Sequence, residues 1–334
     1  MREYKISKEE NNIRLDKYVK KVLKEAPLSM IYKLFRKKDI KVNGKPANDK
    51  TVLQEGDTVR IYLVEEKYND VASQKKINIK QHHFKVVYED ENILIVSKPI
   101  GMVVQDAENV NEATLTDEVR SYLYEKKEYN PSMQIGFDPS PAHRIDRNTS
   151  GLVIYGKNME SLQDLNDMFK RRVGIHKTYL ALVCGKVDKE GKINKPLNKD
   201  EKDKTVRIDY KEGKTAITAY APVLYNDDFS LVEVKILTGR THQIRVHFNS
   251  IGHSLIGDKK YGDFRVNSYF EDNFKWKNQF LHAYKIDFEG IEGKLSYLNN
   301  KSIVDALDES KEKVINLVFN VDVKKFLIKK CKNF

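Results

Sequence analysis

The chain has 334 residues, with 60 Lys and Arg against 49 Asp and Glu, a formal net charge of +11 and a sequence pI of about 9.2. Two cysteines, Cys184 and Cys331, are too few for a disulfide framework and suit a reducing compartment. The N-terminus lacks the apolar core of a signal peptide, and no apolar run approaches the length of a membrane span. We therefore expect a cytoplasmic protein without a membrane partner, long enough for two domains.

A first module is predicted over residues 13–64. Apolar residues recur at helical spacing from Leu15 to Leu23, and Ser29 is a candidate cap for a second helix. A tight turn at Asn43-Gly44 and an alternating closing strand over 59–63 follow. The pattern predicts a small helix–helix–strand unit.

The charge excess is concentrated at this end of the chain. Residues 1–64 hold sixteen Lys and Arg and nine Asp and Glu, which is +7 of the net +11. Four of these cations are predicted to be exposed on the second helix and directly after it, namely Lys33, Arg36, Lys37 and Lys38. A basic end domain on a nearly balanced body is typical of a polyanion-binding module, but a solvated Lys-rich surface would give the same excess.

Residues 65–83 are polar and Lys-rich, which predicts a linker. Beyond it, strands dominate, and the clearest are predicted over 93–96, 152–155, 179–183 and 232–237. Helices are predicted over 115–124 and 161–169. Because strands and helices do not alternate strictly, we expect an α+β body around a mixed or largely antiparallel sheet.

One carboxylate lies between two arginines at the start of an apolar run. Asp146 is flanked by Arg144 and Arg147 in HRIDRNTSG, and a predicted strand follows at once. Nearby positive charge favours the ionised form of a carboxylate, and such a group can act as a nucleophile. An Asp before Asn-Thr-Ser-Gly can equally be a turn residue, so residue types alone leave both interpretations open.

A second stretch, GRTHQIRVH, places Arg240 and Arg245 among hydrogen-bonding side chains. Arginines in this density suit a phosphate-rich substrate, so the two stretches together indicate chemistry on a nucleic acid. His242 and His247 are five residues apart with no cysteine nearby, which argues against zinc. No glycine-rich nucleotide loop with the required pattern is present. We therefore expect neither a metal nor an organic cofactor.

Longer motifs carry two family resemblances. The segment RLDKYV…IYKLFRKKDIKVNGK…EGDTVRIYL resembles the small RNA-binding module named after a small-subunit ribosomal protein, S-four. HRIDRNTSGLVIYGKN is very similar to the central signature of the RluA family of pseudouridine synthases. YEDENILIVSKPIGMVVQ, KTYLALVCGKV, LTGRTHQIRVHFNSIGHSLIGDKKYG and FLHAYKIDF continue that similarity. The resemblance implies a catalytic domain over 84–289, and the role of residues 290–334 stays open.

The resemblance also implies the reaction, which is the isomerisation of selected uridines in RNA to pseudouridine. Asp146 carries over as the essential carboxylate and Arg245 as its ion-pair partner. Tyr179 carries over as the ring that stacks on uracil and helps to remove the C5 proton, although a core tyrosine on a strand is the alternative. Arg144 would either occupy the space vacated by the flipped nucleotide or hold the displaced backbone.

Further residues carry over to the RNA side of the cleft. Arg240, His242 and Gln243 would line it, and Leu281 would supply an apolar wall, while a structural role for Arg240 and His242 stays open. The expected partner is large-subunit ribosomal RNA or a precursor ribosome, with tRNA as an alternative, bound by a monomer. A non-catalytic RNA-binding assembly factor is a further alternative, but it would not need Asp146, Tyr179 and Arg245 together. Another enzyme with the same RNA-binding module would need a methyl-donor or nucleotide site, which the sequence lacks.

Overall fold

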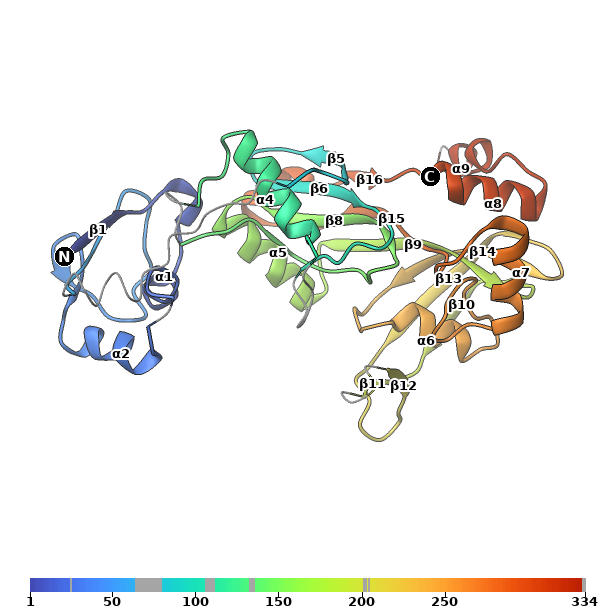
Figure 1. Ribbon diagram of the computed structural model, residues 1–334, viewed down its shortest axis with the longest axis horizontal. Coiled ribbons are helices and arrows are strands. Elements are labelled where there is room, and N and C mark those ends of the chain that lie inside the picture. Colours follow the sequence, from blue (N-terminus) through green and yellow to red (C-terminus); the bar gives the residue numbers. More distant parts are fainter. Residues whose placement is uncertain are drawn as a thin grey trace.

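The structure is a computed structural model that describes residues 1–24, 26–63, 80–105, 112–131, 136–200, 203 and 205–331. An N-terminal unit lies at one end, a body around one large sheet lies in the middle, and two C-terminal helices pack against the body (Figure 1). Most of the linker predicted over 65–83 lies outside the described residues, which resume at Lys80.

The N-terminal unit packs two helices against a small antiparallel sheet of strand order β1-β4-β2-β3. In chain order its elements are β1 (Arg2–Lys5), the 3-10 helix η1 (Lys8–Glu10), α1 (Leu15–Val22), α2 (Leu28–Arg36), β2 (Ile40–Val42), β3 (Lys45–Pro46) and β4 (Thr58–Ile61). The predicted first helix is confirmed as α1 and the closing strand as β4. The predicted turn is confirmed by the left-handed φ values of Asn43 and Gly44, 50° and 79°.

Two details of this unit differ from the sequence pattern. Ser29 does not cap α2, because the helix begins one residue earlier, at Leu28, with Pro27 at the N-cap. The sheet also begins before residue 13, since β1 pairs with β4 over its whole length and Ile6 is buried in the core of the unit. The unit therefore includes the residues before Ile13.

The body confirms an α+β fold around a mixed, mostly antiparallel sheet. Among the described residues, ten strands form this sheet, with the main order β10-β13-β14-β9-β15-β8-β6-β5. The strands are β5 (Lys85–Glu89), β6 (Ile93–Lys98), β7 (Ser140–Pro141), β8 (Ser150–Gly156), β9 (Ile175–Cys184), β10 (Gly191–Asn194), β13 (Ile217–Tyr225), β14 (Phe229–Ile236), β15 (Leu281–Phe288) and β16 (Ser302–Val304). A separate hairpin joins β11 (Leu197–Lys199) to β12 (Val206–Ile208).

Helices cover both faces of the large sheet, because successive side chains of each strand point to opposite faces. On one face, a core cluster includes residues of α4 (Leu115–Glu125) and α6 (Gln243–Asn249). On the other face, α5 (Met159–Arg171) covers one half, and α7 (Phe264–Phe274) and α8 (Glu309–Phe319) cover the other. The predicted helices over 115–124 and 161–169 are confirmed as α4 and α5.

One parallel pairing, β8 with β15, sets the position of the loop that precedes β8. Ser150 lies opposite His282, and Gly151 lies opposite Ala283. Gly151 has φ 108°, and a Cβ there would lie 2.3 Å from the carbonyl oxygen of Ala283. Only glycine therefore lets the two strands approach, and this approach brings the HRIDRNTS loop beside the start of β15.

Part of the segment after residue 289 belongs to the body. The 3-10 helix η2 (Gly293–Leu298) buries Leu295 and Leu298, and β16 pairs with β15. Beyond it, α8 and α9 (Val323–Cys331) pack against the sheet with Val314, Ile315 and Val323 buried. No helix in the described ranges has the length and apolar character that crossing a bilayer requires.

The N-terminal unit contacts the body at several places. Met159 of α5 packs against the core of the unit, Lys8 Nζ lies 3.8 Å from the Glu91 carboxylate, and two side chains of the unit bind the backbone of Gly136. Lys21 Nζ donates to the carbonyl oxygen of Gly136 at 2.9 Å, and the Glu10 carboxylate accepts from the Gly136 backbone N–H. The ring of Tyr18 lies where a side chain at position 136 would project. These contacts fix where the N-terminal unit sits against the body.

Candidate active site

A cavity of about 1840 Å³ opens between the loop before β8, the start of β9, the N-terminus of α6 and the start of β15. Twelve Lys and Arg residues line it, against four Asp and Glu: Arg144, Arg147, Lys170, Arg172, Lys177, Lys199, Lys235, Arg240, Arg245, Lys260, Lys285 and Lys301, against Asp146, Glu233, Asp287 and Glu289. This excess of positive charge gives the cavity an attraction for a polyanion.

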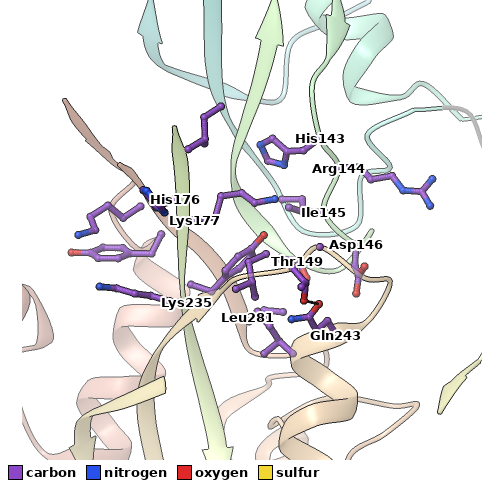
Figure 2. A pocket seen from close by; sticks show the side chains of 18 of the residues that line it. His143, Arg144, Ile145, Asp146, Thr149, His176, Lys177, Lys235, Gln243 and Leu281 are labelled. Carbon is purple, nitrogen blue, oxygen red and sulfur yellow. Dashed lines mark hydrogen bonds between the residues drawn. The ribbon is translucent and has the colours of Figure 1, made fainter. Parts of the chain in front are cut away.

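Asp146 lies in the loop between β7 and β8, and its side chain is 27% exposed. Its backbone carbonyl accepts from the Thr149 N–H at 3.1 Å, so the residue also begins a turn. Figure 2 shows Asp146 and Thr149 on this loop, with Gln243 and Leu281 across from it. The turn and the half-exposed carboxylate are compatible, because the backbone forms the turn while the side chain faces the cavity.

Arg245, on α6, binds two carboxylates from other parts of the chain. Its Nη1 donates to Asp146 at 3.0 Å, while its Nε and Nη2 donate to Asp258 at 2.7 and 2.9 Å. Asp258 is 1% exposed, and its pKa is lowered by these bonds against the opposing effect of burial. The sequence predicted the pairing of Arg245 with Asp146. The two-bond partner, however, is Asp258.

Gln279 supports the same carboxylate from the start of β15. Its amide nitrogen lies 3.5 Å from Asp146 and donates to the Thr149 hydroxyl at 2.8 Å. Gln279 is 4% exposed, so the contact is sheltered from solvent. Asp146 is thus oriented from two sides, by a cation on α6 and by an amide before β15.

Tyr179 lies near the middle of β9 and is buried at the edge of the cavity. Val234 and Ala283 face it across the two neighbouring strands. Leu281, also buried, lines the cavity beside it. Burial raises the pKa of Tyr179 far above its usual value, and the charge of Asp146 raises it further, so its hydroxyl is protonated at neutral pH.

His242 precedes α6 in a left-handed conformation, with φ 52°. Its Nδ1 shares a hydrogen bond of 2.8 Å with the Tyr261 hydroxyl, and its Nε2 lies 4.0 Å from the Asp146 carboxylate. Burial lowers the pKa of His242 despite the opposing charge of Asp146. The Tyr261 ring lies 5.0 Å from the guanidinium of Arg245, so this tyrosine connects the histidine with the arginine.

Three further residues were predicted from the sequence to contact RNA, and the structure places them differently with respect to the cavity. Arg144 is exposed and lines the cavity. Arg240 also lines it, while its Nε donates to the Thr215 carbonyl at 3.1 Å. Gln243 is 4% exposed and uses its amide group within the protein, with bonds to Thr238, Arg240, Ile217 and Thr218. This geometry favours a supporting role for Gln243 over a direct RNA contact.

Four predicted RNA contacts lie outside the cavity. Lys33, Arg36, Lys37 and Lys38 are all exposed on the N-terminal unit, on α2 and the turn after it. None of them lines the cavity. An RNA bound by these side chains and by the cavity together would have to span the two units.

Asp258, Gln279 and Tyr261 are the residues that sequence reasoning missed. Asp258 and Tyr261 lie in the stretch GHSLIGDKKYG, and Gln279 directly precedes FLHAYKIDF. Both stretches carry the family resemblance, but nothing in their residue types indicates contact with Asp146. The described residues contain no group of three or more His, Cys, Asp and Glu side chains that could hold a metal ion.

Comparison with known proteins identifies the family. Residues 92–250 match the model of the RNA pseudouridylate synthase family. An uncharacterized RNA pseudouridine synthase of Mycoplasma capricolum is 34% identical over 316 residues, which cover 91% of this chain and 97% of that one. The chain belongs to the RluA family of RNA pseudouridine synthases. It is therefore an isomerase that modifies RNA.

Two further comparisons refine this picture. The synthase is 34% identical to the ribosomal large subunit pseudouridine synthase C of Vibrio cholerae, over 82% of this chain and 84% of that one. Its fold resembles the solved human RNA pseudouridylate synthase domain containing 4, with a TM-score of 0.53 and 18% identity over 67% of this chain and 89% of that one. The family model does not extend to the N-terminal unit.

Proposed function

We propose that this synthase converts specific uridines of large-subunit ribosomal RNA to pseudouridine, with Asp146 as the essential carboxylate. The observation that carries the proposal is the position of the partly exposed Asp146 carboxylate. Arg245 and Gln279 hold it at the wall of a strongly basic cavity, next to the buried Tyr179. The carboxylate is oriented but not enclosed, which a group that reacts with a bound ribose requires.

The reaction exchanges one bond to C1′ for another. The N1–C1′ bond breaks, the uracil rotates within the site, and a C5–C1′ bond forms. The C5 proton leaves, and N1 gains a proton, so no external oxidant, reductant or leaving group is needed. Asp146 serves either by attacking C1′ or by taking a proton from C2′ to give a glycal, and both routes need it ionised.

The other side chains bind and orient the substrate. Tyr179 and Leu281 form the apolar surface against which the uracil lies. Arg144, exposed at the rim, occupies the space that the flipped nucleotide leaves, an extrusion that costs about a few kcal/mol. Arg240 and His242 line the RNA side of the cavity.

The N-terminal unit supports ribosomal RNA as the substrate. We assign it as an RNA-binding module similar to that of the S-four protein, because its basic side chains Lys33, Arg36, Lys37 and Lys38 are all exposed. Relatives that are about a third identical over more than four fifths of this chain are ribosomal large subunit pseudouridine synthases. A ribosomal RNA substrate implies that the synthase works in the cytoplasm.

Mapping pseudouridines in total RNA from cells with and without the gene tests this proposal. We expect specific large-subunit positions to lose pseudouridine, and to regain it with the wild-type gene but not with Asp146→Asn. Loss confined to tRNA would show that tRNA is the substrate. Unchanged pseudouridine in every RNA would contradict the proposed substrate class.

A further inference from the structure

Lys177 is a cation of the cavity that the proposed chemistry does not use. It lies on β9 two residues before Tyr179, so the two side chains leave the strand on the same side. Both line the cavity. Figure 2 shows Lys177 on this strand, beside the loop that carries His143 and Ile145. The ammonium group therefore belongs to the same recess as the uracil-binding surface.

The surroundings of Lys177 are aromatic and aliphatic. Its Nζ lies 4.9 Å from the centre of the Phe169 ring, and Ile236 and Ile286 face it on the two neighbouring strands. Within the described part of the chain, no carboxylate forms an ion pair with this ammonium. Burial lowers the pKa of Lys177 to about 8, so the ammonium is still mostly protonated at neutral pH.

A titratable neighbour of Lys177, His143, does not supply a negative charge. His143 packs against the same Phe169 ring, with 5.0 Å between ring centres, and accepts at Nε2 from the Ile154 N–H at 3.3 Å. Burial and the positive charge of Lys177 hold the pKa of His143 well below its usual value. The histidine is therefore neutral, and of the two groups that pack against Phe169 only Lys177 carries a positive charge.

Other buried cations near Asp146 have protein partners. Arg245 donates three hydrogen bonds to Asp146 and Asp258. Lys98 is 1% exposed, and its Nζ donates to the carbonyl oxygens of Pro99, Met102 and Arg147 at 2.8, 2.8 and 2.9 Å. Lys98 is thus satisfied by the protein and closed to a ligand. Lys177 differs on both counts, since it lines the cavity and lacks a charged partner.

We propose that Lys177 binds a backbone phosphate of the RNA next to the target uridine. The inference rests on the proposed function only in that it takes a bound RNA as the source of the phosphate. A partly desolvated cation without a counter-ion is unfavourable in the free protein, and a phosphate oxygen in the cavity supplies both the charge and a hydrogen-bond acceptor. Lys177 is then a positioning residue, because it fixes the backbone of the nucleotide whose base lies against Tyr179.

The test removes one phosphate charge at a time. The probe is a short RNA that the wild-type synthase converts, whether from ribosomal RNA or tRNA, made as a set with a single neutral methylphosphonate at each linkage around the target. We expect one linkage to weaken wild-type binding about tenfold when it is neutralised, as loss of one charge-assisted bond predicts. Lys177→Met should bind the unmodified RNA about tenfold more weakly than the wild type does. In this variant, neutralising that linkage should lower RNA affinity by less than about twofold.

Lys235→Met is the matched control. Lys235 is exposed, lines the same cavity and lies on the adjacent strand opposite Thr178. Lys235→Met removes one positive charge from the cavity, as Lys177→Met does. In this variant, neutralising each linkage should weaken RNA binding by the same factor as in the wild type. Methionine suits the apolar surroundings of Lys177, so the melting temperature should be unchanged.

Two outcomes would overturn the proposal. One is that neutralising each linkage weakens RNA binding by the same factor in Lys177→Met as in the wild type. The other is a fall in kcat with unchanged RNA affinity, which would place the ammonium on the detached uracil rather than on a phosphate. Because the probe is chosen by wild-type conversion alone, a result that moves the substrate from ribosomal RNA to tRNA leaves this test valid.

Discussion

Arg245 is held by Asp258 through two hydrogen bonds, at 2.7 and 2.9 Å, and reaches Asp146 with the one nitrogen that remains. Asp258 is almost fully buried, whereas the side chain of Asp146 is 27% exposed. The buried Asp258 therefore fixes the guanidinium on the side away from the cavity. The third donor of the guanidinium binds Asp146, which is exposed to the cavity. This arrangement separates the carboxylate that anchors the arginine from the partly exposed carboxylate that we propose as the reacting group.

Arg245→Lys should lower kcat by about 10- to 100-fold, because an ammonium retains the charge but cannot hold both carboxylates in this geometry. RNA affinity should change little, since the net charge of the cavity is kept. Single-turnover rates and a binding titration measure the two effects. Asp258→Asn should lower kcat in the same direction, because it loosens the same guanidinium without touching Asp146. Wild-type rates in both variants would show that Arg245 does not orient Asp146.

Asp146→Asn should abolish turnover, with a fall of about 10³-fold or more, and leave RNA affinity nearly intact. The amide keeps the shape of the side chain but provides neither a nucleophile nor a base. Pseudouridine formation by purified protein on a substrate RNA is the measurement. Asp287→Asn is the matched control, because Asp287 is a second carboxylate of the same cavity that pairs with Lys285. Equal activity of the two variants would remove Asp146 from the mechanism.

Tyr179→Phe should lower turnover strongly, because it removes the hydroxyl expected to help take the C5 proton. KM for RNA should stay within a few-fold of wild type, because the ring is kept. The pKa of the Tyr179 hydroxyl is raised by burial and then by Asp146, so phenolate is not available at neutral pH. We therefore expect the wild-type pH–rate profile to show no Tyr179 ionisation between pH 6 and about 9. Near wild-type turnover in the variant would reduce Tyr179 to a stacking surface.

Deleting residues 1–66 should spare the chemistry and weaken RNA capture. If the module neutralises roughly five phosphates, the slope of log K against log salt should flatten by about four to five units. The body should still fold, because its three main core clusters contain no residue of the N-terminal unit. Loss of folding would instead show that the contacts between the two units, including those of Glu10, Tyr18 and Lys21 at Gly136 and the packing of Met159, join them into one cooperative unit.

A charge-only variant separates RNA binding from these contacts. Replacing Lys33, Arg36, Lys37 and Lys38 by glutamine leaves the contacts at Gly136 intact. It should flatten the salt slope by up to about 3.6 units if each cation meets one phosphate. An unchanged slope in this variant and in the truncated protein would refute the RNA-binding role of the module.

Stability should fall as pH drops below about 6.5, partly through His282. This residue is 2% exposed, with Nδ1 2.9 Å from the Ser150 hydroxyl and Nε2 3.2 Å from the Asp305 carbonyl oxygen. Burial, and then the charge of Lys311, lower its pKa to about 4 from an ordinary value of 6.5. Between these two values the unfolded chain binds the proton and the folded chain does not. The contribution of His282 is therefore complete above pH 6.5 and is lost progressively as pH falls toward 4.

The expected loss is about 2 kcal/mol by pH 5 and on the order of 3 kcal/mol near pH 4. Urea unfolding at pH 7.5 and pH 5 measures it. His282→Gln, which keeps a donor and an acceptor but does not titrate, should show a correspondingly weaker pH dependence. An equal pH dependence in the two proteins would assign the effect to other groups.

Local patterns predicted most elements of the fold because those patterns are short-range. The helical spacing of Leu15 to Leu23 and the Asn43-Gly44 turn each depend on residues a few positions apart, and both occur as expected. The N-terminal strand Arg2–Lys5 was missed because it is short and polar, and only its pairing with β4 makes it a strand. The cap of α2 was misplaced because Ser29 is a favourable cap by type, yet the helix begins at Leu28.

The sequence by itself predicted the carboxylate and its partner, since the family resemblance of HRIDRNTSG and GRTHQIRVH points to Asp146 and Arg245 before any fold is known. Only the tertiary structure decided which groups hold them. Arg245 meets Asp146 across 99 positions and Gln279 meets it across 133, through the close pairing of Gly151 with Ala283. Among the residues that the structure describes, the same packing gives Lys177 no carboxylate as an ion-pair partner, although it lines the cavity. Such relationships depend on strand register and on approach between distant segments, and local residue types do not encode either.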